Sequence, residues 1–528
     1  MSCSFRALGA LAALLVCSTP ALAKTHNIAA STSLIDGKAL GVQPGDVICL
    51  AAGTRKQLIM RDVVGSAQSR VVIKACAGRV EIRGATSHGF LVLSSQHFQI
   101  SGSGVAGQTY GIYIGATPAG SHGLALGGKS SDYEVDHLEI DSSGFAGIMA
   151  KTDPSCSERD LRSFVQRNTR FHHNHIHDVG GEGFYVGYSW WPQRDDVDCS
   201  GQKVTFYPHE IEDVEIDHNL IERSGWDGLQ VGCATKNARI HHNVIRDHGR
   251  EQVQYQTSGM QINAGTAADI ENNDVRAGSA KGGGLVIFGL GDNRIANNVV
   301  VDVGGTGIYI GDRAKAGTRF VLLNNTIVRP DGDGIRFASR NTVGNQAINN
   351  LVIAPSSKVD VARVYQDVDL SEATNLGFAD VASAKLDADF RPLAGSPVID
   401  KGSAVASYGL STDLDDRARP DPSGLVDVGA YEYYSAPPPP PSDGGNASDG
   451  SPSSPDAASG SDASAVADSS AGDAKASTGD GAASNDGDSG CSCTVGSTTD
   501  NLAWLLLALL LLVIRAAACS GRAGSSRR

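Results

Sequence analysis

The sequence predicts an all-β solenoid, in which short strands stack as successive coils. First, a short phrase with an Asn at one fixed position recurs seven times within residues 168–353, at intervals of 24 to 45 residues. Second, Ile or Val stands two positions after each of these Asn residues, as in Ile176 and Val352. Third, Gly-led apolar runs such as GFYVG at 183–187 lie between the phrases. Repeats of this length cannot bury their apolar side alone and must stack on their neighbours.

The repeated Asn is expected to form a structural ladder. Its members are Asn174, Asn219, Asn243, Asn273, Asn298, Asn325 and Asn350. Side-chain amides at equivalent bends can hydrogen-bond between coils about 4.8 Å apart. A second column precedes them, formed by His137, His173, His218 and His242. Stacked imidazoles cannot all be charged, so this column is also interpreted as structural.

Both ends of the predicted solenoid carry segments that resemble those of a known class of proteins. QPGDVICLAAGT at 43–54 and VVIKACAGRVEIRG at 71–84 resemble the opening of right-handed parallel β-helix proteins, the pectate-lyase-like class. FRPLAGSPVID at 390–400 and VDVGAYEY at 426–433 resemble the closing part of bacterial members. The resemblance implies a right-handed parallel β-helix with a cap and first coils at 24–130, regular coils at 131–355 and a closing segment at 356–435. An insertion is predicted at 188–208.

The termini are predicted to be targeting segments. Residues 1–23 have the charge, apolar stretch and small-residue cleavage site of a signal peptide. Residues 436–490 are rich in Pro, Ser, Gly and Asp and are expected to form a disordered stalk. Cys491 and Cys493, the apolar helix 502–514 and the Arg-rich end at 528 resemble a MYXO-CTERM sorting segment, which implies attachment at the outer cell surface. The alternative is a plain C-terminal membrane anchor, and the protein is expected to be surface-bound or secreted after processing.

Charge and cysteines limit the possible partners. The formal net charge is -14 and no basic stripe is present, so nucleic acid is excluded as an expected partner, and a monomer is expected. In an exported protein, the five cysteines of the predicted β-helix allow two disulfides. Cys49 and Cys76 are expected to pair, and two of the other three to join neighbouring loops, the candidates being Cys156, Cys199 and Cys233.

A polar stripe is predicted on the outer face of the Gly-led strands. The period of two points residues such as Phe184 and Val186 inward. The residues between them, and the one before each glycine, are expected to face solvent and hold a polysaccharide: Lys151, Glu182, Tyr185, Asp227, Gln230, Gln261, Asn263 and Arg336. Trp190, Trp191 and Trp226 are expected to stack on sugar rings. Alternatively, the insertion is a packed element held by Cys199.

Glu182 and Asp227 are the predicted acid and base of a glycoside hydrolase. Placed on adjacent coils, two carboxylates repel, and the pKa of one should rise. Their separation would decide between inversion and retention. The alternative is that Asp227 serves only the turn at Gly228.

A polysaccharide lyase is the other enzymatic hypothesis. Lys151 or His177 would remove the C5 proton of a uronate, Tyr185 would protonate the leaving oxygen, and Ca²⁺ could neutralise the uronate. His175 and His177 with Asp178 could instead bind Zn²⁺. The catalytic patterns of pectate lyases and polygalacturonases do not occur, so no family residues carry over. A non-catalytic glycan-binding or adhesin-like surface protein is the non-enzymatic alternative.

Overall fold

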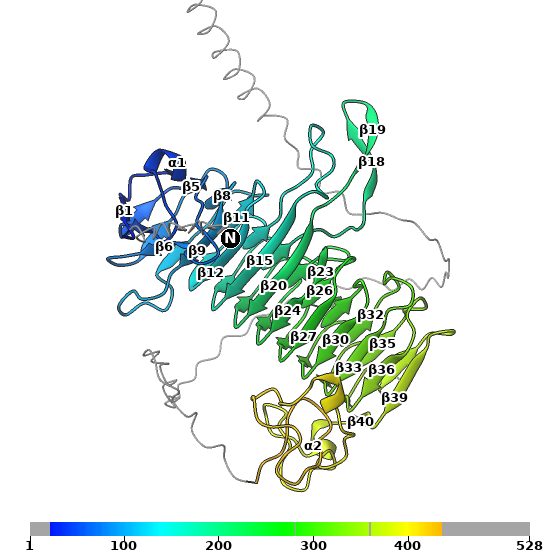
Figure 1. The fold of residues 1–528 in the computed structure, drawn as a ribbon. Coiled ribbons are helices and arrows are strands. Elements are labelled where there is room, and N and C mark those ends of the chain that lie inside the picture. Colours follow the sequence, from blue (N-terminus) through cyan, green and yellow to red (C-terminus); the bar gives the residue numbers. More distant parts are fainter. Residues whose placement is uncertain (1–21, 280, 358–360, 436–528) are drawn as a thin grey trace, which may run out of the picture. The chain divides into compact units, whose positions relative to one another are not determined.

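The computed structural model describes residues 22–279, 281–357 and 361–435. Their strands form a solenoid of three parallel sheets, and each turn of the solenoid is one coil (Figure 1). The predicted signal peptide, stalk, Cys491, Cys493 and helix 502–514 lie outside the described residues, apart from the last two residues of the signal peptide. Within the described ranges, no helix is long and apolar enough to cross a membrane. The all-β solenoid predicted from the sequence is confirmed.

A typical coil contributes one strand to each of the three sheets. Exceptions are the first coil, which has no sheet C strand, and the coil with both β23 (Ala234–Lys236) and β24 (Ala238–His241) in sheet A. Sheet A consists of β1 (Thr25–Ile28), β3 (Val47–Leu50), β6 (Val71–Ala75), β9 (Gln96–Ser101), β12 (Ser131–Asp136), β15 (Val165–His172), β20 (Glu210–Asp217), β23 (Ala234–Lys236), β24 (Ala238–His241), β27 (Ala268–Glu271), β30 (Asn293–Ala296), β33 (Phe320–Leu323), β36 (Asn345–Ile348) and β39 (Leu370–Ala373). Sheet C consists of β4 (Gly53–Arg55), β7 (Val80–Ile82), β10 (Ile112–Ile114), β13 (Leu138–Asp141), β16 (His175–His177), β21 (Leu220–Glu222), β25 (Val244–Arg246), β28 (Asp274–Arg276), β31 (Val299–Val301), β34 (Thr326–Val328), β37 (Leu351–Ile353) and β40 (Leu376–Phe378). Sheet B consists of β2 (Leu34–Asp36), β5 (Leu58–Arg61), β8 (Phe90–Leu93), β11 (Leu124–Gly127), β14 (Ile148–Ala150), β17 (Phe184–Val186), β22 (Leu229–Val231), β26 (Met260–Ile262), β29 (Leu285–Ile287), β32 (Ile308–Ile310), β35 (Ile335–Phe337) and β38 (Ala362–Val364). Short helices lie at α1 (Gly37–Leu40), α2 (Val381–Ala384) and η1 (Ala406–Tyr408).

The apolar core fills the inside of the solenoid. The residues predicted to point inward from sheet B are fully buried, as the alternation of side chains along a strand requires: Ile148, Ala150, Phe184, Val186, Leu229, Val231, Met260 and Ile262. They join Ile and Val residues of sheets A and C in one continuous apolar cluster. Each coil therefore depends on the coils above and below it to bury its apolar side chains.

The predicted Asn ladder is present at the turn from sheet A to sheet C. The side-chain amide of Asn219 donates to the side-chain oxygen of Asn243 at 3.0 Å, and the Asn219 backbone N–H donates to the same oxygen. The side-chain pattern continues from coil to coil and ends at Asn375, which the sequence analysis did not include. Because the amides are buried and satisfied, the ladder is structural, as predicted.

The histidine column stacks beside this ladder. The rings of His173 and His218 lie 5.1 Å apart with an interplanar angle of 1°. Each residue of the column has a left-handed backbone, with φ near 53° for His242, and Asn272 takes the next place. His and Asn tolerate this conformation better than bulkier residues do. The column is thus a row of turn residues, as expected.

The predicted closing segment has two parts. Strands β38 to β40 form the last coil, and residues 380–435 then fold back onto the outside of earlier coils. Phe390 and Val398 pack on Val301 and Val328 of sheet C. This segment covers outward faces of sheet C that have become apolar from Val299 onward.

The last coil has fewer apolar inward residues than the preceding coils, although Ala362 and Leu370 still pack against the core. In sheet A, Glu372 occupies the position that Leu322 and Ala347 fill in the two coils before it. In sheet C, Gly377 follows Val352 at the inward position. The last coil therefore ends the apolar core with a charged residue and a glycine.

Both predicted disulfides are formed. Cys49 pairs with Cys76, and Cys156 pairs with Cys199. The remaining thiol, Cys233, is buried. The second disulfide joins the loop after β14 to the insertion after β17.

Candidate active site

The predicted polar stripe lies on the outer face of sheet B. Tyr185 pairs in register with Gln230, and Gln230 with Gln261, so three successive coils contribute to one row. Arg336 belongs to the same row, three strands beyond Gln261. The predicted stacking of residues far apart in the sequence is confirmed.

The prediction that the whole stripe faces solvent is wrong. Five of its residues are buried: Glu182, Asp227, Gln230, Gln261 and Asn263. The start of the insertion lies over the row, where the Ser189 hydroxyl accepts a hydrogen bond from the Gln230 amide at 2.9 Å. The alternation of side chains separates inward from outward positions, but it does not show whether a later loop covers the outward face.

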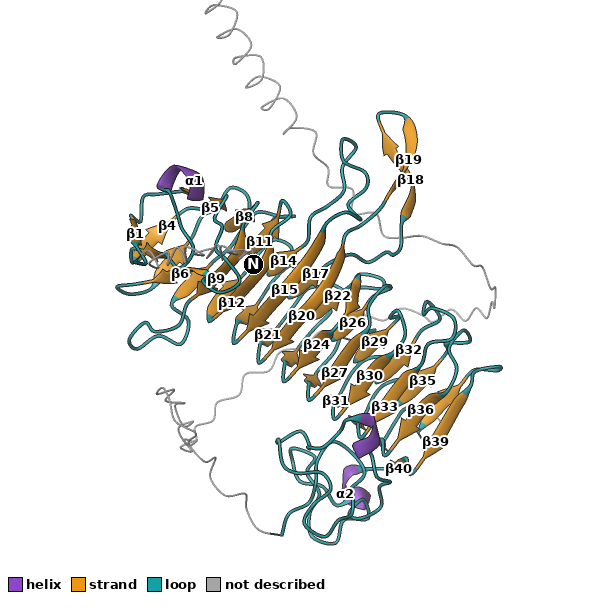
Figure 2. Cartoon of the chain, viewed as in Figure 1, coloured by secondary structure: helices purple, strands orange, loops and turns teal. Residues whose placement is uncertain are grey.

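The insertion is a packed element. Its strands β18 (Arg194–Cys199) and β19 (Gln202–Phe206) form an antiparallel hairpin that projects from the coil (Figure 2). Its tip is joined to the loop after β14 by the Cys156–Cys199 disulfide. Trp190 contacts the Tyr188 ring at 5.1 Å, and the Trp191 ring lies against Gly265. The structure thus favours the packed-insertion alternative for Trp190 and Trp191, and their contact with sugars stays a prediction.

Glu182 and Asp227 occupy the same place on adjacent coils, as predicted. The N–H of Gly183 donates to the Asp227 carbonyl at 3.1 Å, which places the two turns in register. One carboxyl oxygen of Asp227 accepts the Ser258 backbone N–H at 2.6 Å. This bond is the turn role that the alternative reading assigned to Asp227.

Each acid also has one carboxyl oxygen without a partner among the described residues. These atoms are Oε2 of Glu182 and Oδ2 of Asp227, and both are buried. Gln230 and Asn263 nearby on sheet B likewise carry a buried polar atom without a described partner. Buried unpaired polar groups are uncommon because each costs free energy, and their concentration marks this place as a candidate site.

Burial favours the protonated form of both acids. Desolvation raises the pKa of Glu182 to about 7, although the positive charge of Lys151 acts against the rise. Desolvation and the neighbouring Glu182 raise the pKa of Asp227 well above its usual value. Two neighbouring carboxyl groups whose pKa values are raised by their environment can share the roles of proton donor and acceptor.

Lys151 is placed as a cation rather than a base. Its ammonium lies 4.2 Å from the centre of the Tyr185 ring and 3.0 Å from a carboxyl oxygen of Asp153. Burial lowers the pKa of Lys151, but Tyr185 and Asp153 more than offset this, so its pKa is raised. A lysine that holds its proton is poorly suited to the proton removal that the lyase hypothesis assigns to it.

Aromatic rings lie next to the acid pair. The Phe145 ring packs against Gly181, the residue before Glu182. Trp226, the residue before Asp227, contacts Phe145 edge to face at 5.0 Å. Trp226 is therefore close to the acids, as predicted, but is half-buried in this contact.

His177 lies on sheet C and away from the Tyr185 row of sheet B. Its Nδ1 is 2.9 Å from Asp178 and 3.7 Å from Asp141, and these three residues are close enough to hold a metal ion. His175 is not part of this group, which corrects the predicted zinc set. Asp178 is also bound by Arg223 through two bonds of 2.8 Å, so a cation would compete with an arginine there.

Sheet A carries two similar groups of acids and histidine. They are Glu134, Asp136 and His172, and Glu215, Asp217 and His241. In both groups, the histidine lies one coil after the acids. Arginines alternate with the acids along the row, and Arg170, for example, forms an ion pair with Glu215 at 3.4 Å. The alternation neutralises charge between neighbouring strands, so these groups have a structural explanation.

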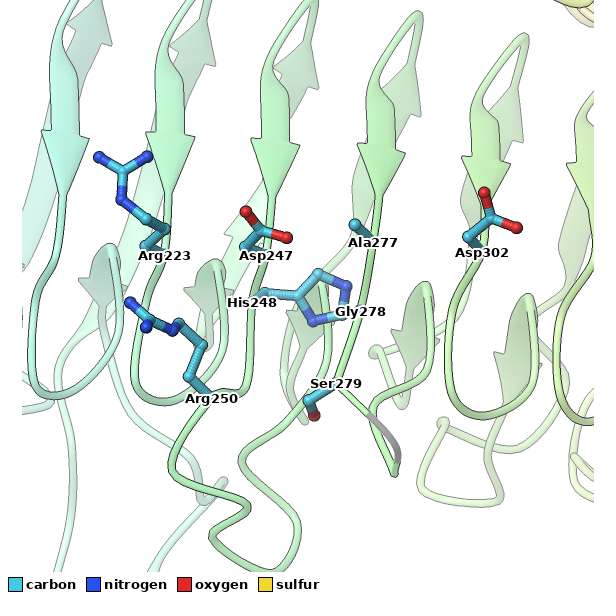
Figure 3. A pocket seen from close by; sticks show the side chains of 8 residues that line it. All are labelled: Arg223, Asp247, His248, Arg250, Ala277, Gly278, Ser279 and Asp302. Carbon is cyan, nitrogen blue, oxygen red and sulfur yellow. The ribbon is translucent and has the colours of Figure 1, made fainter. Parts of the chain in front are cut away.

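A pocket of about 580 Å³ lies on the turns from sheet C to sheet B, and the sequence analysis did not identify it (Figure 3). Its polar lining includes Arg223, Asp247, His248, Arg250 and Asp302. His248 is buried and its Nδ1 donates to a backbone carbonyl, which leaves Nε2 as a buried acceptor without a described partner. The long turn at 247–258 was the available sequence signal for it.

Comparison with known proteins supports the fold. Residues 197–352 match the family model described as "Right handed beta helix region". No curated protein matches the sequence.

Among solved structures, pectate lyase Pel9A is similar, with 13% identity, a TM-score of 0.42, and coverage of 78% of this chain and 96% of that one. DFA-IIIase from Arthrobacter chlorophenolicus A6 shows 12% identity, a TM-score of 0.38, and coverage of 64% and 84%. GH136 lacto-N-biosidase from Eubacterium ramulus shows 13% identity, a TM-score of 0.36, and coverage of 64% and 62%. The parallel sheets, the Asn ladder and the family match together identify the described part of the chain as a right-handed parallel β-helix.

Proposed function

We propose that this protein is a glycoside hydrolase acting on a polysaccharide, with Glu182 and Asp227 as its acid–base pair. The observation that carries the proposal is the pairing of two buried carboxyl groups on adjacent coils, each with an unpartnered oxygen and a raised pKa. Structural carboxylates are ordinarily ion-paired or fully hydrogen-bonded. Asp333, at the equivalent place four coils beyond Asp227, is bound by two arginines.

The two acids would take different roles. Burial and the neighbouring Glu182 both raise the pKa of Asp227, so Asp227 would donate a proton to the leaving oxygen. Glu182 feels the positive charge of Lys151 and would ionise first, to act as nucleophile or base. Adjacent coils lie about 4.8 Å apart, which is closer to the roughly 5 Å separation of retaining enzymes than to the wider separation of inverting ones.

Access to the pair requires a movement. Glu182 and Asp227 are only 1% and 0% exposed, so a glycan would reach them after the Trp226 and Phe145 rings move aside. Enclosure of the bond to be cleaved then excludes bulk water, which strengthens electrostatic interactions. The structure favours hydrolysis over elimination because Lys151 retains its proton and His177 lies on another sheet.

The burial of both acids also fits the alternative that the protein binds glycans at the cell surface without cleaving them. Such a protein needs no carboxyl pair that is accessible to the glycan. Two disulfides among the described residues support export in either case. Attachment at the outer surface through Cys491 and Cys493 is part of the proposal and belongs to residues outside the described ranges.

The test uses the secreted chain and a panel of plant, algal and bacterial polysaccharides. New reducing ends would report hydrolysis, and ultraviolet absorbance of unsaturated products would report elimination. Glu182→Gln and Asp227→Asn are expected to lower turnover by about 10²-fold or more, while Glu158→Gln, in an exposed ion pair with Lys129, should not change it. Wild-type turnover in both acid variants would disprove the assignment, and binding without any turnover would favour the glycan-binding alternative.

A further inference from the structure

The outer face of sheet B is open beyond the insertion. From β29 onward, its main row consists of Val286, Tyr309, Arg336 and Arg363 in direct register. These residues are half-buried or exposed, in contrast to Gln230 and Gln261 earlier in the row. We call these four residues, with Phe288, Arg313 and Tyr365 beside them, the open strip.

Two arginines of the open strip are held side by side by one buried acid. Asp333, whose side chain is 1% exposed, accepts from Nε of Arg336 at 2.6 Å and from Nε of Arg363 at 3.0 Å. The arginine side chains remain 35% and 45% exposed. Within the described ranges, no hydrogen-bond partner is present for their terminal Nη groups. Two guanidinium groups on one carboxylate leave a net positive charge.

Aromatic rings lie around this pair. Tyr309 precedes Arg336 in the row, and Tyr365 is 41% exposed two residues after Arg363. The guanidinium of Arg313 lies 4.4 Å from the centre of the Phe288 ring and adds a third positive charge. The strip is thus cationic and aromatic on a chain whose net charge is -14.

We propose that the open strip binds a glycan that carries carboxylate groups. The planar fork of a guanidinium matches a carboxylate through two parallel hydrogen bonds, and Asp333 holds both forks in place before binding. Tyr309 and Tyr365 offer ring faces for the sugars. The positive charge of the strip favours an acidic glycan over a neutral one.

This inference rests on the proposed function only in taking a glycan as the partner. The strip and the acid pair are separated along sheet B by the covered residues Gln230 and Gln261. Binding at the strip can therefore occur whether or not Glu182 and Asp227 catalyse hydrolysis. The tests are separable because binding is measured without turnover.

The experiment measures binding of polyuronates to the full chain carrying Glu182→Gln, by titration calorimetry. Polygalacturonate, alginate and hyaluronan are compared with fully methyl-esterified polygalacturonate, which has no charge. At least one polyuronate should bind, binding should weaken with added salt, and the ester should not bind. The double variant Arg336→Gln/Arg363→Gln should bind about tenfold more weakly or worse.

The control is Arg329→Gln, which removes an arginine paired with Asp302 on another face and should leave binding unchanged. Tyr365→Ala offers a variant that keeps all charges and should also weaken binding. Circular dichroism checks that each variant is folded. The proposal is overturned if no polyuronate binds, if the ester binds equally well, or if the folded double variant binds like its parent.

Discussion

Replacement of Glu182 by Gln should remove a pH dependence of stability. Folding raises the pKa of Glu182 from 4.5 to about 7, mainly through burial, so the native state keeps a proton that the unfolded state releases. The contribution of Glu182 to the stability of the native state is therefore fully present below pH 4.5 and is lost as pH rises through 7. A shift of this size corresponds to about 3 kcal/mol of unfolding free energy.

The assay is guanidinium unfolding of wild type and Glu182→Gln between pH 4.5 and 8. Gln leaves a buried amide without a partner, and that cost is the same at every pH. The informative quantity is therefore the change with pH: wild type should lose about 3 kcal/mol relative to the variant across this range. Glu158→Gln, on the exposed Lys129 pair, serves as the control. Parallel pH profiles for wild type and Glu182→Gln would refute the reasoning.

Three further predictions concern the scaffold. Replacing Cys156 and Cys199 by Ser should lower the unfolding free energy by about 2–4 kcal/mol and expose the hairpin to proteolysis; unchanged digestion would contradict this. Asn243→Ala breaks ladder bonds on both sides and should cost about 2–4 kcal/mol, measured by denaturant unfolding against the exposed Asn341→Ala, and equal costs would argue against the ladder. Burial and the neighbouring histidines lower the pKa of His173, so stability should fall as pH drops through 6.5; His173→Asn should flatten this loss in thermal scans, and an unchanged slope would contradict it.

The repeating pattern made the coil predictable because every coil repeats the same local chemistry. The Asn ladder, the histidine column and the alternation of Phe184 and Val186 each depend only on spacing within one repeat. Residues of a solenoid meet the same position in the next coil, so the row from Tyr185 to Arg336 could also be inferred.

The covered half of sheet B could not be inferred in this way. Burial of Gln230 depends on where Ser189 and the insertion fold back, and the insertion is not part of the repeating sequence pattern. The pairing of Asp333 with Arg336 and Arg363 was not predicted either, because it depends on how side chains of two neighbouring coils pack. Sequence spacing predicts which residues share a row, whereas loop packing decides which of them meet solvent.

The composition of the final coil has a consequence for self-association. Parallel strands at the end of a solenoid leave backbone groups that could pair with another molecule. Because Glu372 and Gly377 stand where earlier coils place Leu322 and Val352, a second molecule docked there would have to desolvate a carboxylate and would gain less apolar contact than neighbouring coils gain from each other. Glu372 and Gly377 thereby disfavour lengthwise growth into fibres at this end of the solenoid.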